Sequence, residues 1–253
     1  MHIAEVALSS ETGEEGLEAL GNLLGAYRLN GQALGREFPL YERDGAYRAV
    51  VLVPARDSLE PRYANRWVAD WLADISRISH HAPVISILGE APDARDPCAC
   101  EERTSLILYT TYVSLESCLR CGDCFDPVPL YTIPATADAE YHDILSWQSD
   151  YQACDQLQMN CRTGERFGLR ELSRLDSSLS RRGLEICRKI EAGTGLPTFY
   201  YLLRYYGVSA RRERERPCPG CGQPWRLDEP LHRLFDFRCE PCRLLSNLAS
   251  MVR

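Results

Sequence analysis

The amino-acid sequence predicts an α+β protein built from three consecutive parts. Residues 1–90 alternate between strand-like and helix-like segments, and residues 91–212 contain closely spaced cysteines followed by mostly helical patterns. Residues 213–253 contain two Cys-x-x-Cys pairs, which predict a zinc ribbon. Hydrophobic residues make up 45% of the 253 residues and charged residues 26%, so a largely disordered or collagen-like chain is excluded.

The first part predicts the order β-α-β-β-α-β. Residues 3–8 form a strand candidate, and a helical stripe of leucines follows from Thr12 onward. Asp44-Gly45 marks a hairpin turn before the strand at 46–53. A second helical stripe precedes a buried strand at 83–88. This order is the ferredoxin-like βαββαβ arrangement, which serves enzymes, RNA binders and interaction domains alike.

The second part contains a strand candidate at 105–112 and three helix candidates at 139–161, 165–175 and about 177–192. Its cysteines offer five candidates for a site of four ligands: Cys98, Cys100, Cys118, Cys121 and Cys124. The best pair is Cys121-Gly-Asp-Cys124, with Cys98 and Cys100 as the other pair and Cys118 left over. The run from Cys118 to Cys124 also matches part of an iron–sulfur pattern. That pattern requires a further cysteine where Val128 stands, so the spacing favours zinc.

The third part has the spacing C-x2-C-x17-C-x2-C, formed by Cys218, Cys221, Cys239 and Cys242. Each pair offers two thiolates to one ion, and the residues between the pairs form strands that bring the four together. The sequence therefore predicts a structural zinc ion here and a second one at the central cysteines. Cys154, Cys161 and Cys187 are expected to be buried thiols.

The net charge of −7 is the sum of an acidic first part of the chain and a basic second part. Residues 1–161 contain 11 basic and 25 acidic residues, whereas residues 162–253 contain 18 basic and 11 acidic ones. Arginine suits phosphate because its planar guanidinium donates in pairs. We therefore predict that the protein binds RNA or DNA through arginines. Four of them recur at every fourth position, and four more follow later in the chain: Arg162, Arg166, Arg170 and Arg174, then Arg181, Arg182, Arg211 and Arg212. Four tyrosines at 200–206 could stack on bases or belong to the core.

Two other functions are open on the sequence alone. The acidic first half could bind a basic protein surface, which would make the chain an interaction adaptor or a neutralising partner. An enzyme is less favoured, because the P-loop, HExxH and Gly-x-Ser-x-Gly signatures are all absent. Each cysteine set also offers four thiol ligands, which is typical of structural rather than catalytic zinc.

The location follows from the same features. The N-terminal residues do not resemble a secretory signal, and no apolar run approaches the roughly 20 residues of a membrane span. We expect a cytoplasmic protein without membrane contact, in which clustered cysteines bind metal rather than form disulfides.

Three segments resemble an uncharacterised bacterial family described as containing a zinc ribbon, with nucleic-acid binding suggested. They are CGDCFDPVPLY from Cys121, PTFYYL from Pro197 and LHRLFDFRCEPCRLLSN from Leu231. The resemblance extends over nearly the whole chain, including Asn30-Gly31-Gln32. It implies zinc at Cys218, Cys221, Cys239 and Cys242, a role with nucleic acid, and no established reaction.

Overall fold

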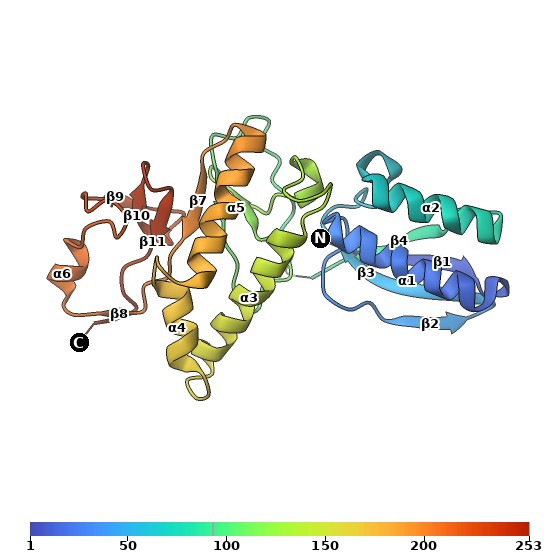
Figure 1. The fold of residues 1–253 in the computed structure, drawn as a ribbon, viewed down its shortest axis with the longest axis horizontal. Helices are drawn as coiled ribbons and strands as arrows, with labels where there is room; N and C mark the ends of the chain where they lie inside the picture. Colours follow the sequence, from blue (N-terminus) through green and yellow to red (C-terminus); the bar gives the residue numbers. More distant parts are fainter. Residues whose placement is uncertain (93, 253) are drawn as a thin grey trace. The chain divides into compact units, whose positions relative to one another are not determined.

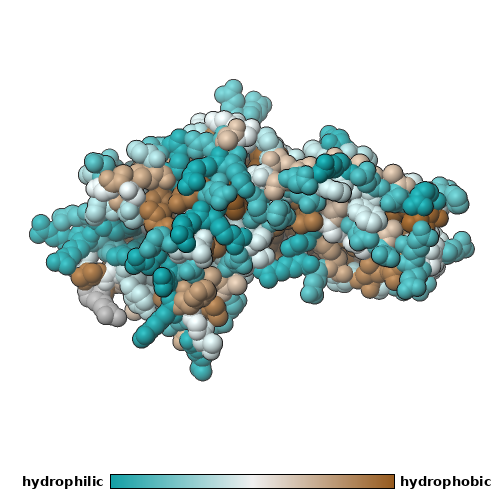
Figure 2. All heavy atoms as spheres, viewed as in Figure 1, coloured by the Kyte–Doolittle hydropathy of each residue, from teal (hydrophilic) through white to brown (hydrophobic). Residues whose placement is uncertain are grey.

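The computed structural model describes residues 1–92 and 94–252, which form two compact units (Figure 1). The first unit comprises 1–97 together with 115–117 and 126–142, and the second comprises 98–114, 118–125 and 143–253. No described helix is both long enough and apolar enough to cross a membrane. Hydrophilic side chains cover much of the face seen in Figure 2, with apolar ones scattered among them.

The first unit has the predicted element order. Its elements are β1 (His2–Ser9), α1 (Gly13–Leu29), β2 (Leu40–Arg43), β3 (Ala46–Val53), α2 (Arg66–Ser79) and β4 (Val84–Glu90), with 3-10 turns at Ser10–Thr12, Pro61–Tyr63 and Leu130–Thr132. The sheet order is β2-β3-β1-β4, and all neighbours are antiparallel. This confirms the ferredoxin-like prediction for the N-terminal region.

The core of this unit lies between the sheet and its two helices. Alternate residues of β1, Ala4, Val6 and Leu8, are buried, as the two-residue period of a strand requires. The strand predicted at 83–88 is present as β4, but its predicted burial was wrong, because β4 is an edge strand. Val84 is 64% exposed and Leu88 is 55% exposed.

A segment distant in sequence completes the first unit. The amide of Tyr141 donates to the Leu29 carbonyl (3.0 Å), and the hydroxyls of Tyr131 and Ser58 lie 2.8 Å apart. Burial raises the pKa of Tyr131 to about 12, so this hydroxyl stays protonated. Residues 126–142 therefore pack with the ferredoxin-like elements although the central cysteines precede them.

The second unit contains the remaining elements. They are β5 (Leu106–Leu108), β6 (Leu119–Cys121), α3 (His142–Met159), α4 (Glu165–Ser173), α5 (Ser178–Thr194), β7 (Thr198–Tyr201), β8 (Tyr206–Gly207), α6 (Ala210–Arg214), β9 (Arg226–Leu231), β10 (Phe235–Cys239), β11 (Leu244–Ser246) and β12 (Met251–Val252). Helix α5 begins after Ser177, whose hydroxyl accepts from the Ser180 amide (3.1 Å). It ends at Gly195 in the left-handed conformation.

One sheet runs through the second unit in the order β6-β5-β7-β11-β10-β9. Its centre is parallel: β7 pairs with β5 and with β11, where Leu244 opposes Tyr200. Strands from the predicted central part and from residues 213–253 therefore belong to one sheet. The sequence suggested a separate C-terminal module, because parallel pairing between distant strands leaves no local pattern.

Candidate metal centres

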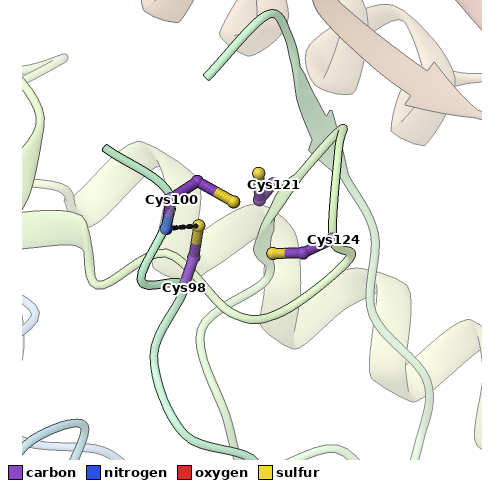
Figure 3. Close-up of side chains that lie close together, drawn as sticks. All are labelled: Cys98, Cys100, Cys121 and Cys124. Atoms are coloured by element: carbon purple, nitrogen blue, oxygen red, sulfur yellow. Dashed lines mark hydrogen bonds between the residues drawn. The ribbon is translucent and has the colours of Figure 1, made fainter. Parts of the chain in front are cut away.

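The central cysteine set consists of Cys98, Cys100, Cys121 and Cys124, whose Sγ atoms all lie within 4.8 Å of one another. Cys98 and Cys100 come from a segment without regular secondary structure, whereas Cys121 ends β6 and Cys124 follows in the next turn. Figure 3 shows the four side chains converging from these two segments. Four thiolates bound to zinc at about 2.3 Å form a compact tetrahedron, so this donor set fits one ion after small adjustments.

Backbone amides support the thiols of this set. The Cys100 amide donates to Cys98 Sγ (3.4 Å), and the Asp123 amide donates to Cys121 Sγ (3.4 Å). Such bonds stabilise thiolates, the form that binds metal. Asp123 in turn accepts from the Thr104 amide (2.8 Å), which fixes the turn between Cys121 and Cys124.

Arg103 adds a positive charge next to the central set. Burial alone would raise the pKa of Cys98, but hydrogen bonds from Arg103 and from the Cys100 amide lower it to about 7. No sequence motif marks Arg103. Its position three residues after Cys100 was the one sequence feature that could have indicated this role, because a nearby cation offsets the charge of clustered thiolates.

Cys118 does not belong to the set of four. Its side chain is fully buried, and burial raises its pKa to about 12, so it remains a thiol. Cys154 and Cys187 are buried as predicted, but Cys161 is exposed, because α3 ends at Met159 and Cys161 lies in the turn beyond it.

The C-terminal cysteine set consists of Cys218, Cys221, Cys239 and Cys242, and its Sγ atoms also lie within 4.8 Å of one another. The Sγ atoms of Cys221 and Cys239 are 3.6 Å apart. A hydrogen bond involving the Gln223 backbone lowers the pKa of Cys221 to about 7, against the opposing effect of desolvation. Cys239 ends β10, in which the buried Phe235 and Phe237 alternate with the half-buried Asp236 and Arg238.

Gly220 allows the two pairs of the C-terminal set to approach closely. A Cβ atom at this position would lie 2.7 Å from Cys242 Sγ, which is too close for any side chain. Two turn hydrogen bonds shape the same loop: the Gly222 amide donates to the Cys218 carbonyl, and the Cys218 amide donates to the Gln223 carbonyl, both at 2.9 Å.

His232 joins the two halves of the second unit, and the sequence did not reveal this role. Its Nε2 atom lies 2.8 Å from the carbonyl oxygen of Gly122, inside the Cys121–Cys124 turn. The imidazole also stacks on Phe125, with ring centroids 4.9 Å apart. The turn between β9 and β10 therefore contacts the turn that carries half of the central set.

The predicted arginine row is interrupted. Only Arg166 and Arg170 lie within α4, where both are exposed; Arg162 precedes this helix and Arg174 follows it. Several members already face acids: Arg174 pairs with Asp176 (2.9 Å), Arg182 with Asp150, and Arg211 with Glu215 (3.1 Å). Arg181 and Arg212 are exposed, and neither forms an ion pair with any residue that the structure describes.

The tyrosines at 200–206 divide between core and surface. Tyr200 is fully buried and Tyr201 is 6% exposed, so neither ring can stack on a base. Tyr205 is half-buried, and Tyr206 is exposed at the edge of the small β8–β12 pair.

Comparisons with known proteins find relatives over the whole chain. An uncharacterised protein of Haemophilus influenzae is 35% identical over 257 residues, covering 98% of each chain. A second uncharacterised protein of this organism is 42% identical over 143 residues, covering 56% of this chain and 70% of its own. Three models of domains of unknown function match: DUF8589 at residues 1–89, DUF2310 at 100–203 and DUF8594 at 207–251.

Solved structures resemble part of the chain. Rv0793 from Mycobacterium tuberculosis is 14% identical, with 37% of this chain and 99% of that chain covered and a TM-score of 0.29. An antibiotic biosynthesis monooxygenase is also 14% identical, with 36% and 99% covered and a TM-score of 0.28.

Proposed function

The chain belongs to the family of the Haemophilus influenzae protein that matches it from end to end, and we propose that it is a non-catalytic zinc protein that binds nucleic acid. In this proposal each cysteine set holds one zinc ion. Residues 213–253 form a zinc ribbon, and the arginines of the second unit contact phosphates.

The convergence of two sets of four thiols carries the metal part of the proposal. A donor set of four sulfurs suits zinc or an iron–sulfur centre rather than magnesium or calcium. The central set combines Cys98 and Cys100 with Cys121 and Cys124 and leaves out Cys118, a member of the incomplete iron–sulfur run, which supports zinc. Zinc therefore fits both sets better.

Four protein ligands give each site a closed coordination shell. A catalytic zinc keeps one position for water or substrate, whereas four cysteines leave none. When bound, the ions would supply folding free energy by cross-linking distant segments. This chemistry supports a structural role for the metal and a binding role for the protein.

The charge of the second unit supports nucleic acid as the partner. Residues 162–216 contain 13 basic and 7 acidic residues. Arg166, Arg170, Arg181 and Arg212 are exposed without an ion-pair partner among the described residues. Free guanidinium groups can displace counterions from phosphates, the main source of affinity in sequence-independent binding.

A binding titration at low salt tests the proposal. The full-length protein, purified without chelators, should retard labelled single-stranded or double-stranded RNA or DNA. Reversing the charges with Arg166→Glu, Arg170→Glu and Arg174→Glu should weaken binding and reduce its dependence on salt. Absence of any retardation by zinc-loaded protein would refute the nucleic-acid role. A nuclease-resistant stoichiometric protein partner would point to the adaptor function instead.

A further inference from the structure

Three adjoining hollows run along α5 beside the C-terminal cysteine set, and we call them together the knuckle groove. The first, of about 770 Å³, meets the second, of about 350 Å³, at Leu175. The second shares four lining residues with the third, of about 430 Å³. One wall is the exposed stripe of α5, and the other includes Pro219, Gly220, Pro241 and Cys242 of the C-terminal cysteine pairs.

Five arginines line the knuckle groove: Arg174, Arg181, Arg188, Arg204 and Arg243. Three of them are engaged with acids. Arg174 pairs with Asp176, Arg204 with the buried Glu213, and Arg243 with Glu191 at 2.8 Å. Arg181 and Arg188 are exposed and form no ion pair with any residue in the described part of the chain.

These two arginines are placed to reach separate phosphates. They lie seven residues apart on α5, which is two helical turns and about 10 Å along the axis. Leu184 lies between them on the same stripe and also lines the groove. An arginine–leucine–arginine stripe opposite two prolines offers cations to phosphates and apolar surface to the sugars between them.

The lining residues determine what kind of ligand the groove would accept. None of those that border the three hollows is aromatic, and the nearby rings of Tyr200 and Tyr201 are buried. A site without stacking rings recognises the backbone rather than the bases. Two unpaired cations two turns apart on one helix stripe can contact successive phosphates of one strand.

We propose that the knuckle groove binds the sugar–phosphate backbone of a single nucleic-acid strand, with Arg181 and Arg188 as its main phosphate contacts. This inference rests on the proposed function and names the surface of the second unit that would bind the nucleic acid. It also makes binding depend on metal, because Pro219, Gly220, Pro241 and Cys242 belong to the pairs that an ion in the C-terminal set would fix.

Fluorescence anisotropy of the full-length protein with labelled oligothymidylate, measured over a range of salt concentrations, tests this. The variant Arg181→Gln with Arg188→Gln should bind about tenfold more weakly, because two arginine–phosphate contacts, each weakened by exposure to solvent, are lost. Its logarithmic salt slope should fall by about 1.4, the value for two single-strand phosphates. The matched control is Arg56→Gln with Arg226→Gln, two exposed arginines outside the groove. It should bind within roughly twofold of wild type.

The outcomes separate the two proposals. If wild type binds and the groove variant matches the control, the groove is not the site, although the protein still binds nucleic acid. If wild type itself fails to bind, the proposed function fails as well. Circular dichroism and metal content, unchanged in both double variants, would show that any loss does not come from misfolding.

Discussion

Gly220 is a single residue on which the C-terminal cysteine set depends. The space where its Cβ would lie is occupied by Cys242 Sγ, at 2.7 Å. Real Cβ atoms do not approach a sulfur so closely, so any larger residue must move a ligand. A Cys-x-Gly-Cys pair could be identified from the sequence, but the atom that excludes a side chain could not.

Gly220→Ala should therefore weaken metal binding at the C-terminal set while leaving the central set intact. A misplaced thiolate lengthens one metal–sulfur bond, and zinc sites tolerate deviations of only about 0.2 Å. Competition with a chromogenic chelator should show about half of the bound zinc released more readily, since half of the proposed ligands belong to this set.

Gln223→Ala serves as the matched control for this experiment. The residue is exposed, and its backbone, which the substitution keeps, makes the turn hydrogen bond to Cys218. Equal zinc release from Gly220→Ala and Gln223→Ala would show that the close approach of Gly220 and Cys242 has no effect on the site.

Helix α5 joins the metal-bearing sheet to the proposed groove. Its buried side contacts β7 at Gly183, where a Cβ would lie 2.3 Å from Cε2 of Tyr200 and 2.9 Å from Nε1 of Trp147. Its exposed side carries Arg181, Leu184 and Arg188 into the groove. The distance between helix and sheet is therefore set by a residue without a side chain.

Gly183→Ala should destabilise the protein by about 1–3 kcal/mol, the usual cost of overpacking a core. Urea unfolding measures this change. Gly21→Ala on α1 is the control, because its Cβ would meet nothing within 4 Å. That substitution should instead be neutral or stabilise by up to about 1 kcal/mol. Equal stabilities for the two variants would contradict the close packing of α5 on β7.

Elements with strong local patterns could be predicted, and their long-range pairing could not. The hairpin at Asp44-Gly45 follows from its turn residues and occurs as expected, and the helix predicted at about 177–192 is present as α5, which ends two residues later at Thr194. The exposed edge position of β4 and the parallel pairing of β7 with β11 depend on contacts between distant residues. The hydrophobic pattern of a strand does not show which distant strand it pairs with.

The whole second unit depends on contacts that link its two cysteine sets. The sheet is continuous from β6, which ends at Cys121, to β10, which ends at Cys239. His232 strengthens this link by contacting the Gly122 carbonyl. The spacing of the cysteines predicted the C-terminal set of four, and for the central set it left five candidates, of which the structure brings four together. Neither Arg103 nor His232 carried a motif, because their positions follow only from the folded chain.

The excess of basic residues in the second half of the sequence overstates the positive charge that the folded molecule exposes. Much of the basic character near the cysteine sets is neutralised locally, as in the pairing of Arg204 with Glu213 and of Arg243 with Glu191. A charge count cannot distinguish paired from free guanidinium groups. Of the arginines predicted to contact phosphates, Arg166, Arg170, Arg181 and Arg212 are exposed and form no ion pair with the described residues.

X-ray absorption spectroscopy at the zinc edge, combined with metal quantification of the purified protein, tests the central claim most directly. Because two sets of four cysteines converge, we predict about two zinc ions per chain, each surrounded by four sulfurs at about 2.3 Å. A single zinc, a shell containing nitrogen or oxygen ligands, or iron accompanied by visible absorption would contradict it.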